Sequence, residues 1–327
     1  MLRGKSVVVT DDELSAPRSP DEVSALRSSD RDRRSRYRTG RKRDRRDYRT
    51  RPTVTTIIPA LNEAENLPHV LKQLPNGINE LIIIDGHSTD ETVPVTQSLR
   101  PDARIVFQDR MGKGNALACG FAAARGDIIV MIDADGSTDP TEIPNFIRPL
   151  IDGADFVKGS RYMEGGGSAD ITGLRSLGNR LLGASVNLMF GTEYTDLCYG
   201  YSAFWRRVLP QLHITCDGFE VETVLNVRAA KAGFNIVEVP SYEQERIHGL
   251  SNLNAWRDGR RVLRTIITER VSRLPEPSDA WIPRYTEFGE VTARVLPHAV
   301  VVSDISDISD RRIFLPAPRP AAVPAVA

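Results

Sequence analysis

The sequence has few of the features that mark secreted, zinc-binding or membrane-spanning proteins. Its 327 residues include only three cysteines, Cys119, Cys198 and Cys216, which are scattered and odd in number. This argues against a disulfide framework or a zinc site and indicates a reducing compartment. No apolar stretch reaches the roughly eighteen residues of a membrane-spanning helix, and the run near the N-terminus is too short for a signal peptide. These absences predict a cytoplasmic protein, either soluble or peripheral at the inner face of the membrane.

Charge of one sign is not in excess either, because Lys plus Arg and Asp plus Glu both number 43. The basic residues are nevertheless concentrated between Arg31 and Arg51, in a segment with almost no apolar residues. Such a segment cannot bury a core, and we predict that it is disordered. A solvated tail is its simplest interpretation, and attraction to anionic lipid is the alternative. Only Tyr37 and Tyr48 could stack on bases, so no nucleic-acid partner is expected.

The composition divides the chain into three parts. Residues 1–51 form the predicted disordered arm, and 52–274 have the length and pattern of one α/β domain. Beyond Leu274 the chain is rich in proline, alanine and valine, which predicts a mostly irregular tail over 275–327.

Within 52–274, short β-branched runs alternate with helical stripes. Strands are predicted at 54–59, 81–84, 104–107, within 126–136, at 155–158 and at 234–239. One helix is predicted to begin at Asn62, where Glu65 suits a capping box, and 112–114 is predicted to be a loop. Further helices are predicted over 115–124, 140–151, 174–190, 220–232 and 256–274. This alternation indicates a largely parallel sheet with right-handed crossovers.

The last predicted helix has two kinds of face. Leu263, Ile266, Ile267, Val271 and Leu274 share one side, and arginines crowd the rest. Packing of the apolar side against the domain is the first interpretation. A basic amphipathic helix that lies on a membrane surface is the alternative.

The strand within 126–136 leads into Asp133-Ala134-Asp135-Gly136. The carboxyl ends of parallel strands are where α/β sheets bind ligands. Two anionic oxygen ligands at this spacing could share one hard divalent cation, with a ligand phosphate and water completing its shell. Because Asp is also common in turns, a solvated turn at the strand end is the other interpretation.

Polar residues follow other strands too and should converge on the same edge of the sheet. Glu63 and Asp85 could accept hydrogen bonds from a nucleoside base or ribose, and Arg161 could bind a phosphate through its planar guanidinium. Lys113, which stands between two glycines, could also approach a phosphate, although its loop is not a Walker motif. Taken singly, each residue has a simpler interpretation as a helix-turn acid, a turn residue or a surface charge.

Six stretches form an ordered set: 54–66 (VTTIIPALNEAEN), 84–90 (IDGHSTD), 133–136 (DADG), 158–162 (KGSRY), 195–201 (TDLCYGY) and 246–251 (RIHGLS). This set resembles family 2 glycosyltransferases in order and spacing. Within that family the chain is most similar to the dolichyl- and polyprenyl-phosphate sugar (mannose) synthases. The resemblance covers about 54–270, which makes it far more specific than any one motif.

The resemblance implies a GT-A-type α/β fold, with a Rossmann-like, mostly parallel sheet flanked by helices. It implies a metal-dependent, inverting transferase that uses a nucleotide-sugar donor, a polyprenyl-phosphate lipid or other glycosyl acceptor, and Mg²⁺ or Mn²⁺. By position, the nucleoside pocket would be lined by Pro59, Leu61, Glu63, Ile84 and Asp85. The donor diphosphate and metal would be contacted by Asp133, Ala134 and Asp135, and a donor or acceptor phosphate by Arg161 and Arg246.

Three positions depart from the family pattern. Gly86 stands where relatives commonly have a second acid that contacts the nucleoside, which affects base selectivity. Asn252 replaces the Lys that usually follows the last Ser, which removes a phosphate-binding charge. Ser137 takes the place of a further polar metal ligand found in some relatives.

The acceptor decides whether a general base is needed. A lipid phosphate is already anionic, and Arg161 and Arg246 would place it. A hydroxyl acceptor would need a carboxylate within hydrogen-bond reach; Asp196 is our first choice and Glu222 our second.

We favour transfer to a polyprenyl-phosphate acceptor, which would involve peripheral membrane contact. Three alternatives stay open at this point. They are transfer to a soluble sugar or metabolite, a sugar-phosphate nucleotidyltransferase, and a catalytically silent nucleotide-sugar binder.

Overall fold

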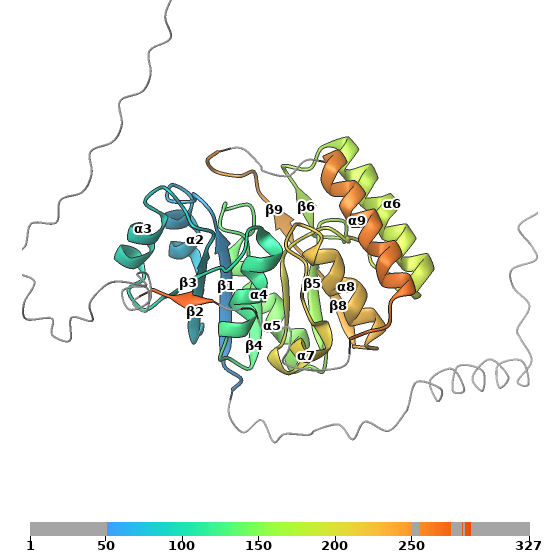
Figure 1. Ribbon diagram of the computed structural model, residues 1–327, viewed down its shortest axis with the longest axis horizontal. Helices are drawn as coiled ribbons and strands as arrows, with labels where there is room; N and C mark the ends of the chain where they lie inside the picture. The colour runs from blue at the N-terminus through green and yellow to red at the C-terminus, as the bar shows by residue number, and fades with distance from the viewer. Residues whose placement is uncertain (1–50, 250–254, 276–282, 284, 289–327) are drawn as a thin grey trace, which may run out of the picture. The chain divides into compact units, whose positions relative to one another are not determined.

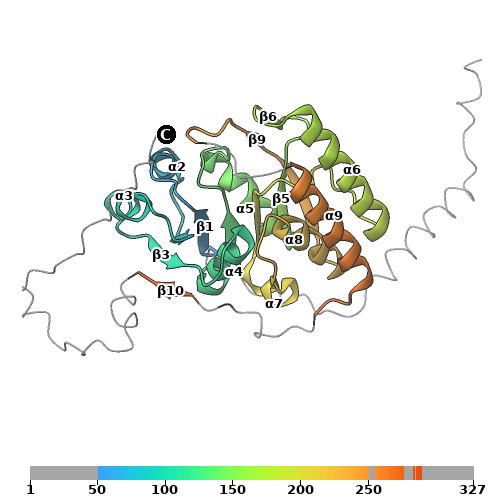
Figure 2. The same cartoon turned by 45° about the horizontal axis from the view of Figure 1, so that its top comes forward.

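An eight-stranded mixed sheet is the centre of the structure, a computed structural model that describes residues 51–249, 255–275, 283 and 285–288. The described residues from Pro52 onward belong to one unit, with helices on both faces of the sheet (Figures 1 and 2). Apart from Arg51, the predicted disordered arm lies outside the described residues, as does most of the predicted tail. The predicted boundaries of the domain therefore stay predictions.

The strand order of the large sheet is β10-β3-β2-β1-β4-β7-β5-β8. Its strands are β1 (Val54–Ala60), β2 (Glu80–Asp85), β3 (Arg104–Phe107), β4 (Ile128–Met131), β5 (Phe156–Ser160), β7 (Ser202–Trp205), β8 (Ile236–Pro240) and β10 (Thr286–Glu287). A second, two-stranded sheet pairs β6 (Gly167–Ser168) with β9 (Tyr242–Glu243). The predicted α/β class with a mostly parallel sheet is confirmed.

Two strands run against the rest and were not expected. Strand β7 lies between β4 and β5 and is antiparallel to both, and β10 is antiparallel to β3. All four residues of β7 are buried, so this strand lacks the alternation that marks a half-exposed strand. Strand β10 falls in the proline-rich tail, where no strand was predicted.

Helices occupy the connections between these strands. They are α2 (Leu67–Gln73), α3 (Thr92–Leu99), α4 (Lys113–Ala123), α5 (Ile143–Ile151, after a 3₁₀ turn at Pro140–Glu142), α6 (Gly173–Phe190), α7 (Leu209–Leu212, after a 3₁₀ turn at Arg206–Val208), α8 (Val221–Lys231) and α9 (Ala255–Val271). Helix α4 packs against β1, β2 and β3, and α5 packs against β4, β5, β7 and β8. Helices α6 and α9 pack on each other at one end of the sheet (Figures 1 and 2).

One helix begins later than predicted and another begins earlier. The helix expected from Asn62 begins at Leu67, because Asn62 adopts a left-handed conformation (φ 56°) and its side chain accepts a hydrogen bond from the Thr89 amide at 2.8 Å. The predicted capping box is therefore wrong. Lys113, expected in a loop, is the first residue of α4.

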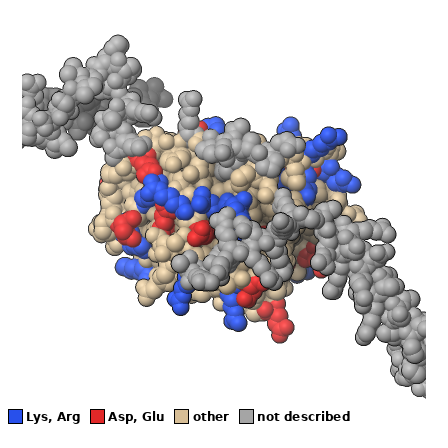
Figure 3. Space-filling model, turned by 90° about the horizontal axis from the view of Figure 1, so that it is seen from below, with Lys and Arg blue, Asp and Glu red and all other residues tan. Residues whose placement is uncertain are grey.

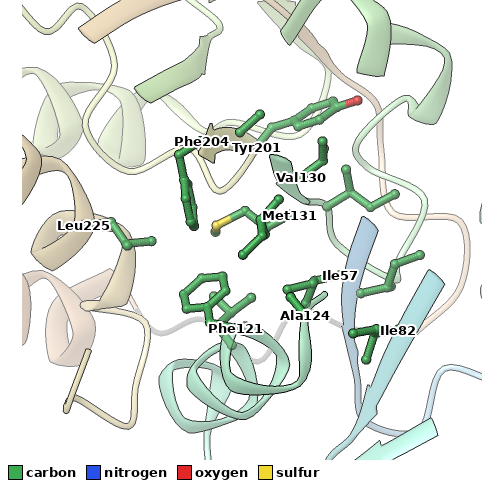
Figure 4. Close-up of a cluster of buried hydrophobic side chains, with 14 of the residues drawn as sticks. Ile57, Ile82, Phe121, Ala124, Val130, Met131, Tyr201, Phe204 and Leu225 are labelled. Carbon is green, nitrogen blue, oxygen red and sulfur yellow. The ribbon is translucent and has the colours of Figure 1, made fainter. Parts of the chain in front are cut away.

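The main core includes residues of α2, α4, α5 and α8 together with the middle strands of the sheet. Phe204 of β7 packs edge-on against Phe121 of α4 at 5.4 Å and stacks on Phe156 at 5.5 Å between ring centroids. Figure 4 shows Phe121 and Phe204 gathered around Met131 of β4. Burying each such side chain stabilises the fold by about 1.5–3 kcal/mol.

Helix α4 lies unusually close to the sheet, because small residues line it. A Cβ atom on Gly120 would come within 2.7 Å of Ile57 and 2.8 Å of Ile84. The small-residue pattern of this helix is therefore a requirement of its packing on β1 and β2.

A smaller core joins α6, α8 and α9. It contains Val186, Tyr194, Leu197, Val227, Val262 and Ile266. Helix α6 begins where Thr172 Oγ1 accepts a hydrogen bond from the Arg175 amide, and it ends at Gly191, whose left-handed conformation (φ 68°) stops it.

Helix α9 packs through a different side from the one predicted. Of the five apolar residues expected to face the domain, Ile266 is fully buried, whereas Leu263, Ile267 and Val271 are exposed. The buried side is completed by Val262 and by two acids, Asp258 and Glu269. Charged residues count as polar in a periodicity argument, so the sequence pattern selected the wrong face. Within the residues that the structure describes, no helix is both long and apolar enough to span a bilayer.

Candidate active site

Ion pairs connect the polar residues that follow the parallel strands. Three cationic side chains, Lys113, Arg161 and Arg246, each bind carboxylates from more than one segment of the chain. These pairs bring together Glu63 after β1, the Asp133–Asp135 segment after β4, and residues of the C-terminal half. Glu63 and Asp135 are thus brought together as expected, whereas Arg161 pairs with Asp196 and Glu243 rather than with these acids.

The first cluster is centred on Lys113 at the start of α4. Its Nζ lies 2.6 Å from Asp133 Oδ1 and 2.8 Å from Glu222 Oε1 of α8. The backbone of Gly200 passes directly over this cluster, since a Cβ atom there would lie 2.8 Å from Glu222 Oε1 and 3.0 Å from Lys113 Nζ. A side chain at position 200 would therefore displace these three charged groups.

Burial and pairing act in opposite directions on the protonation of this cluster. Burial lowers the pKa of Lys113, but the carboxylates of Asp133 and Glu222 raise it by more, so the ammonium stays charged. Burial raises the pKa of Glu222, and Lys113 only partly offsets that rise. Glu222 is therefore a carboxylate that holds a proton more readily than an exposed glutamate.

The second cluster is centred on Arg246. Its guanidinium binds both oxygens of Glu63, at 3.0 and 3.2 Å, and also lies 3.3 Å from Asp135 Oδ2. Burial raises the pKa of Glu63, against the effect of hydrogen bonds from Asn66 and Arg246. One arginine thus joins the residue predicted for the nucleoside pocket to a residue predicted for the metal.

The segment that carries Arg246 is tied down over the strand ends. The Ile247 amide donates to the Asp135 carbonyl at 3.2 Å, and the His248 amide donates to Asn66 Oδ1 at 2.9 Å. Gly136 has a left-handed conformation (φ 80°), and a Cβ atom on it would lie 2.5 Å from Ile247. The glycine after the two aspartates therefore lets this segment close on them.

The third cluster is the most buried. Arg161 binds Asp196 through Nε at 2.7 Å and Nη2 at 3.0 Å, binds Glu243 through Nη1 at 3.0 Å, and lies 4.9 Å from the centre of the Tyr199 ring. Asn179 of α6 donates to Asp196 Oδ1 at 2.9 Å. The pKa of Asp196 is lowered, because the bonds from Arg161 outweigh the effect of burial.

This geometry argues against our first choice of general base. Asp196 is 0% exposed, and both its oxygens already accept hydrogen bonds from Arg161 and Asn179. A lowered pKa also makes it a poor proton acceptor. Asp196 instead holds Arg161 in place, and Glu222, our second choice, lies beside Asp133.

The predicted nucleoside pocket contains an unsatisfied buried acceptor. Ile84 and Asp85 end β2 and are buried, Pro59 is half-buried in β1, and Leu61 is exposed. Asp85 Oδ2 accepts a hydrogen bond from the Ser88 amide at 3.0 Å, whereas Asp85 Oδ1 has no partner among the described residues. A buried oxygen without a donor costs free energy, and an N–H group of a ligand would satisfy it.

The two aspartates of the central stretch suit a divalent cation. The part of the chain that the structure describes holds no group of three or more His, Cys, Asp or Glu arranged for a metal. Asp133 and Asp135 are both partly exposed, Ala134 between them is buried, and the Ser137 amide fixes Asp135 Oδ1 at 3.0 Å. Two hard oxygen donors fit Mg²⁺ or Mn²⁺ when a diphosphate and water supply the remaining ligands.

A cavity of about 480 Å³ lies next to this segment. Its lining includes Gly136, Thr138, Gln244 and Ile247, but none of the predicted site residues. Those residues are instead closed against one another by the ion pairs of Lys113, Arg161 and Arg246.

Sequence reasoning missed two residues of these clusters. Glu243 gave no signal, because it stands in a two-residue strand that pairs with β6 and bridges to Thr138. Asn179 did give one, as a polar residue on the side of a helix that otherwise buries Gly183 and Val186. A polar residue at such a position is usually hydrogen-bonded to something specific.

Comparison with known proteins agrees with this arrangement. Residues 55–212 match the family model described as Glycosyl transferase family 2. The glycosyltransferase AglJ of Haloferax volcanii is 32% identical over 213 residues, which cover 64% of this chain and 69% of that protein. Polyprenol monophosphomannose synthase of Mycolicibacterium smegmatis is 31% identical over 219 residues, which cover 62% of this chain and 83% of that protein.

Solved structures show the same fold. Glucosyl-3-phosphoglycerate synthase from Mycobacterium tuberculosis, in complex with phosphoglyceric acid, superposes with a TM-score of 0.56 at 26% identity, covering 69% of this chain and 81% of that one. The same enzyme with Mn²⁺, uridine diphosphate and glucosyl-3-phosphoglycerate gives a TM-score of 0.55 at 26% identity, covering 72% and 86%. Together these matches show that the chain belongs to glycosyltransferase family 2 and is a nucleotide-sugar glycosyltransferase with a GT-A fold.

Proposed function

We propose that this enzyme transfers a sugar, with inversion, from a nucleotide-sugar donor to a polyprenyl-phosphate lipid, and that it depends on a divalent cation. The observation that carries the proposal is the bridge made by Arg246. Its guanidinium binds Glu63 and Asp135 at once. The residue proposed to bind the nucleoside and the residue proposed to bind the metal and diphosphate therefore both contact the same side chain.

On the donor side, each predicted residue has a task that its surroundings permit. Asp85 Oδ1 would accept a hydrogen bond from the nucleoside base, since it is buried without a partner among the described residues. Pro59, Leu61 and Ile84 would line the pocket, and Glu63 would accept from base or ribose once Arg246 releases it. A Cβ atom added at Gly86 would meet the Ala60 carbonyl at 3.3 Å. Because Gly86 has no side chain that could contact the base, these neighbouring residues would determine which base is bound.

Asp133 and Asp135 would hold the cation. When bound, Mg²⁺ or Mn²⁺ supplies positive charge to the departing diphosphate. Lys113 and Arg246 neutralise the same carboxylates from the protein side and can turn to phosphate oxygens when the donor enters. Mn²⁺ is present with uridine diphosphate in the related glucosyl-3-phosphoglycerate synthase.

On the acceptor side, a lipid phosphate needs no general base because it is already anionic. Of the two arginines predicted to place it, Arg246 is the better candidate, since the side chain of Arg161 is only 4% exposed and already holds two carboxylates. Similarity to polyprenol monophosphomannose synthase supports a lipid acceptor.

A second candidate function is transfer to the hydroxyl group of a soluble acceptor. Glu222 favours it, because a carboxylate with a raised pKa beside Asp133 is suited to take a proton. The related synthase that binds phosphoglyceric acid supports it too. Family membership leaves the nucleotidyltransferase and the silent binder without support.

Partition of radiolabelled sugar tests the two functions together. The full chain is incubated with labelled uridine and guanosine diphosphate sugars, Mg²⁺ or Mn²⁺, and either polyprenyl phosphate or 3-phosphoglycerate. Label in the organic phase that depends on the lipid supports the proposal. Label that appears only in aqueous product supports the second candidate and overturns the first. No transfer from any donor to either acceptor contradicts both.

A further inference from the structure

A short strand from the C-terminal segment completes the edge of the large sheet next to β3. Strand β10 pairs with β3 so that Thr286 lies opposite Phe107, the last residue of β3. The Phe288 amide extends this ladder by donating to the Ile105 carbonyl at 2.9 Å. Figure 2 shows β10 beside β3, across the molecule from α9. The end of β3 is therefore held by a segment outside residues 55–212, which match the family model.

Side chains hold β10 in place as well. Arg104, the first residue of β3, binds Glu287 through Nε at 3.4 Å and also through Nη2. The same guanidinium binds Glu80 of β2 and donates to the Ala123 carbonyl at 2.8 Å. Tyr285, two residues before Glu287 and so on the same face of the strand, packs against the main core. An ion pair and apolar packing therefore add to the backbone ladder.

The position of β10 depends on these local contacts rather than on charge over a broad surface. On the face shown in Figure 3, Lys and Arg side chains are interspersed with Asp and Glu, so that face offers no broad charge of one sign to attract an acidic strand. Without β10, the backbone of β3 would present an unpaired edge. Protection of that edge explains a strand at this position, but it does not explain what the end of β3 contacts on its other side.

The carboxyl end of β3 supports the residues that end and follow β2. Phe107 lies opposite Asp85 in the pairing of β2 with β3, and its ring stacks on His87 at 6.2 Å between ring centroids. His87 Nε2 donates to the Gln108 carbonyl at 2.9 Å. The Gln108 amide donates to the Asp85 carbonyl at 3.3 Å. Asp85 and His87 are therefore both held by the two residues at the end of β3.

His87 needs this support, because its backbone is left-handed (φ 63°). A residue with a Cβ atom keeps such a conformation only where its surroundings hold it there. The loop that His87 shapes follows Asp85, whose buried Oδ1 has no partner among the described residues. A shift of β3 at Phe107 would therefore move the unsatisfied acceptor of the predicted nucleoside pocket.

We propose that docking of β10 on β3 positions the nucleoside pocket, so that the C-terminal segment sets the affinity for the nucleoside part of the donor. Glu287 and Phe288 are then positioning residues, because they contact β3 and act on Asp85 through the end of that strand. The inference rests on the donor site proposed above, and it adds to that site a segment outside the matched family region.

Titration calorimetry of the full chain with Mn²⁺ and either uridine or guanosine diphosphate tests the proposal. Phe288→Pro removes the amide that donates to Ile105, whereas Phe288→Ala keeps it, and the Phe288 side chain is itself exposed. For the diphosphate that wild type binds, Phe288→Pro should raise Kd about fivefold, the equivalent of one misplaced hydrogen bond. Phe288→Ala should bind as wild type does.

A second pair of variants changes the same contact through charge. Glu287→Lys places a cation next to Arg104 and should also raise Kd about fivefold. Glu193→Lys makes the same exchange at an exposed position after α6 and should have no effect. Inorganic pyrophosphate with Mn²⁺, which lacks the nucleoside, should bind all these variants equally. Thermal unfolding verifies that each variant is folded.

Two results would overturn the proposal. One is equal binding of the nucleoside diphosphate by Phe288→Pro and Phe288→Ala. The other is an equal loss of pyrophosphate binding, which would indicate a general disturbance of the fold. Asp85→Asn separates this inference from the proposed function. Wild-type affinity in that variant contradicts the proposed nucleoside pocket, whereas a loss there with none in Phe288→Pro contradicts only the role of β10.

Discussion

The two halves of the domain are stabilised by different means. In the N-terminal half, β1, β2 and β4 bury almost uninterrupted apolar runs, and α4 packs on them through small residues. In the C-terminal half, Lys158, Arg161 and Asp196 are buried together. A buried apolar side chain can pack against any apolar neighbour, whereas a buried charged group requires an oppositely charged or hydrogen-bonding group at a defined position. The first half therefore depends on close apolar packing, and the second depends on individual pairs.

The largest effect on stability should come from the buried pair of the C-terminal half. Asp196→Ala leaves Arg161 without its bidentate partner and should destabilise the fold by about 3–5 kcal/mol. Urea unfolding followed by circular dichroism measures the loss. Asp102→Ala, at an exposed ion pair with Arg100, is the control and should cost less than about 1 kcal/mol. Equal losses in the two variants would contradict the comparison.

The same pair should make stability depend on acid. The pKa of Asp196 is lowered on folding, so its contribution is present above the unfolded value of 3.8 and is lost as pH falls through the folded value. The difference in unfolding free energy between wild type and Asp196→Asn should therefore be constant near neutral pH and shrink below about pH 4. A difference that widens on acidification would reverse the sign we assign.

In the N-terminal half the largest effect should be on activity. Asp135→Asn should lower kcat by about 10²–10³-fold, because a charge that stabilises the leaving diphosphate is removed. Its melting temperature should stay near that of wild type, since Asp135 is partly exposed. Asp152→Asn, at an exposed position after α5, is the matched control. Undiminished turnover in Asp135→Asn would remove this residue from the proposed metal site.

A smaller loss should follow from crowding α4 against the sheet. Gly120→Ala places a Cβ atom at 2.7 Å from Ile57 and 2.8 Å from Ile84, and it should cost about 1–3 kcal/mol despite the better helix propensity of alanine. Gly178→Ala in α6, where a Cβ atom meets nothing within 4 Å, should be neutral or stabilising. Differential scanning calorimetry of the two variants tests the distinction.

The smallest effect should be on the exposed face of α6, where Leu188 lies. Leu188→Ala should change unfolding free energy by less than about 0.5 kcal/mol, because Leu188 is exposed. Leu225→Ala, in the buried core of α8, should cost about 2–5 kcal/mol. If Leu188→Ala were as costly as Leu225→Ala, this face would be part of the core.

The N-terminal half of the domain was also easier to predict from the sequence than the C-terminal half. Strands β1, β2 and β4 and the carboxylates that follow them were predictable, because apolar runs and polar strand ends are local signals. Strand β7 was not, since its place between β4 and β5 depends on pairings with residues far away in the chain. Arg161 and Asp196 are 35 residues apart, and nothing local shows that they bind each other.

The face of α9 was mistaken for a related reason. Periodicity ranks residues by hydrophobicity, whereas Asp258 and Glu269 are buried acids that pair with cations. Asp258 pairs with Arg257 and Arg261, and Glu269 pairs with Arg228 and Lys231. The roles of the motif residues stay predictions, and the geometry argues against Asp196 as the general base. Of the two candidate bases, Asp196 and Glu222, it is Glu222 that shares Lys113 with Asp133, and only the structure shows this contact.

The ion pairs of Lys113 with Asp133 and of Arg246 with Asp135 have a consequence for purification of this enzyme. Because Asp133 and Asp135 each have a counterion from the same polypeptide, we expect the fold to form without a metal. Protein purified in chelator should keep its shape and its melting temperature, and it should regain turnover when the ion returns. The cation in this site would then be needed for catalysis but not for folding.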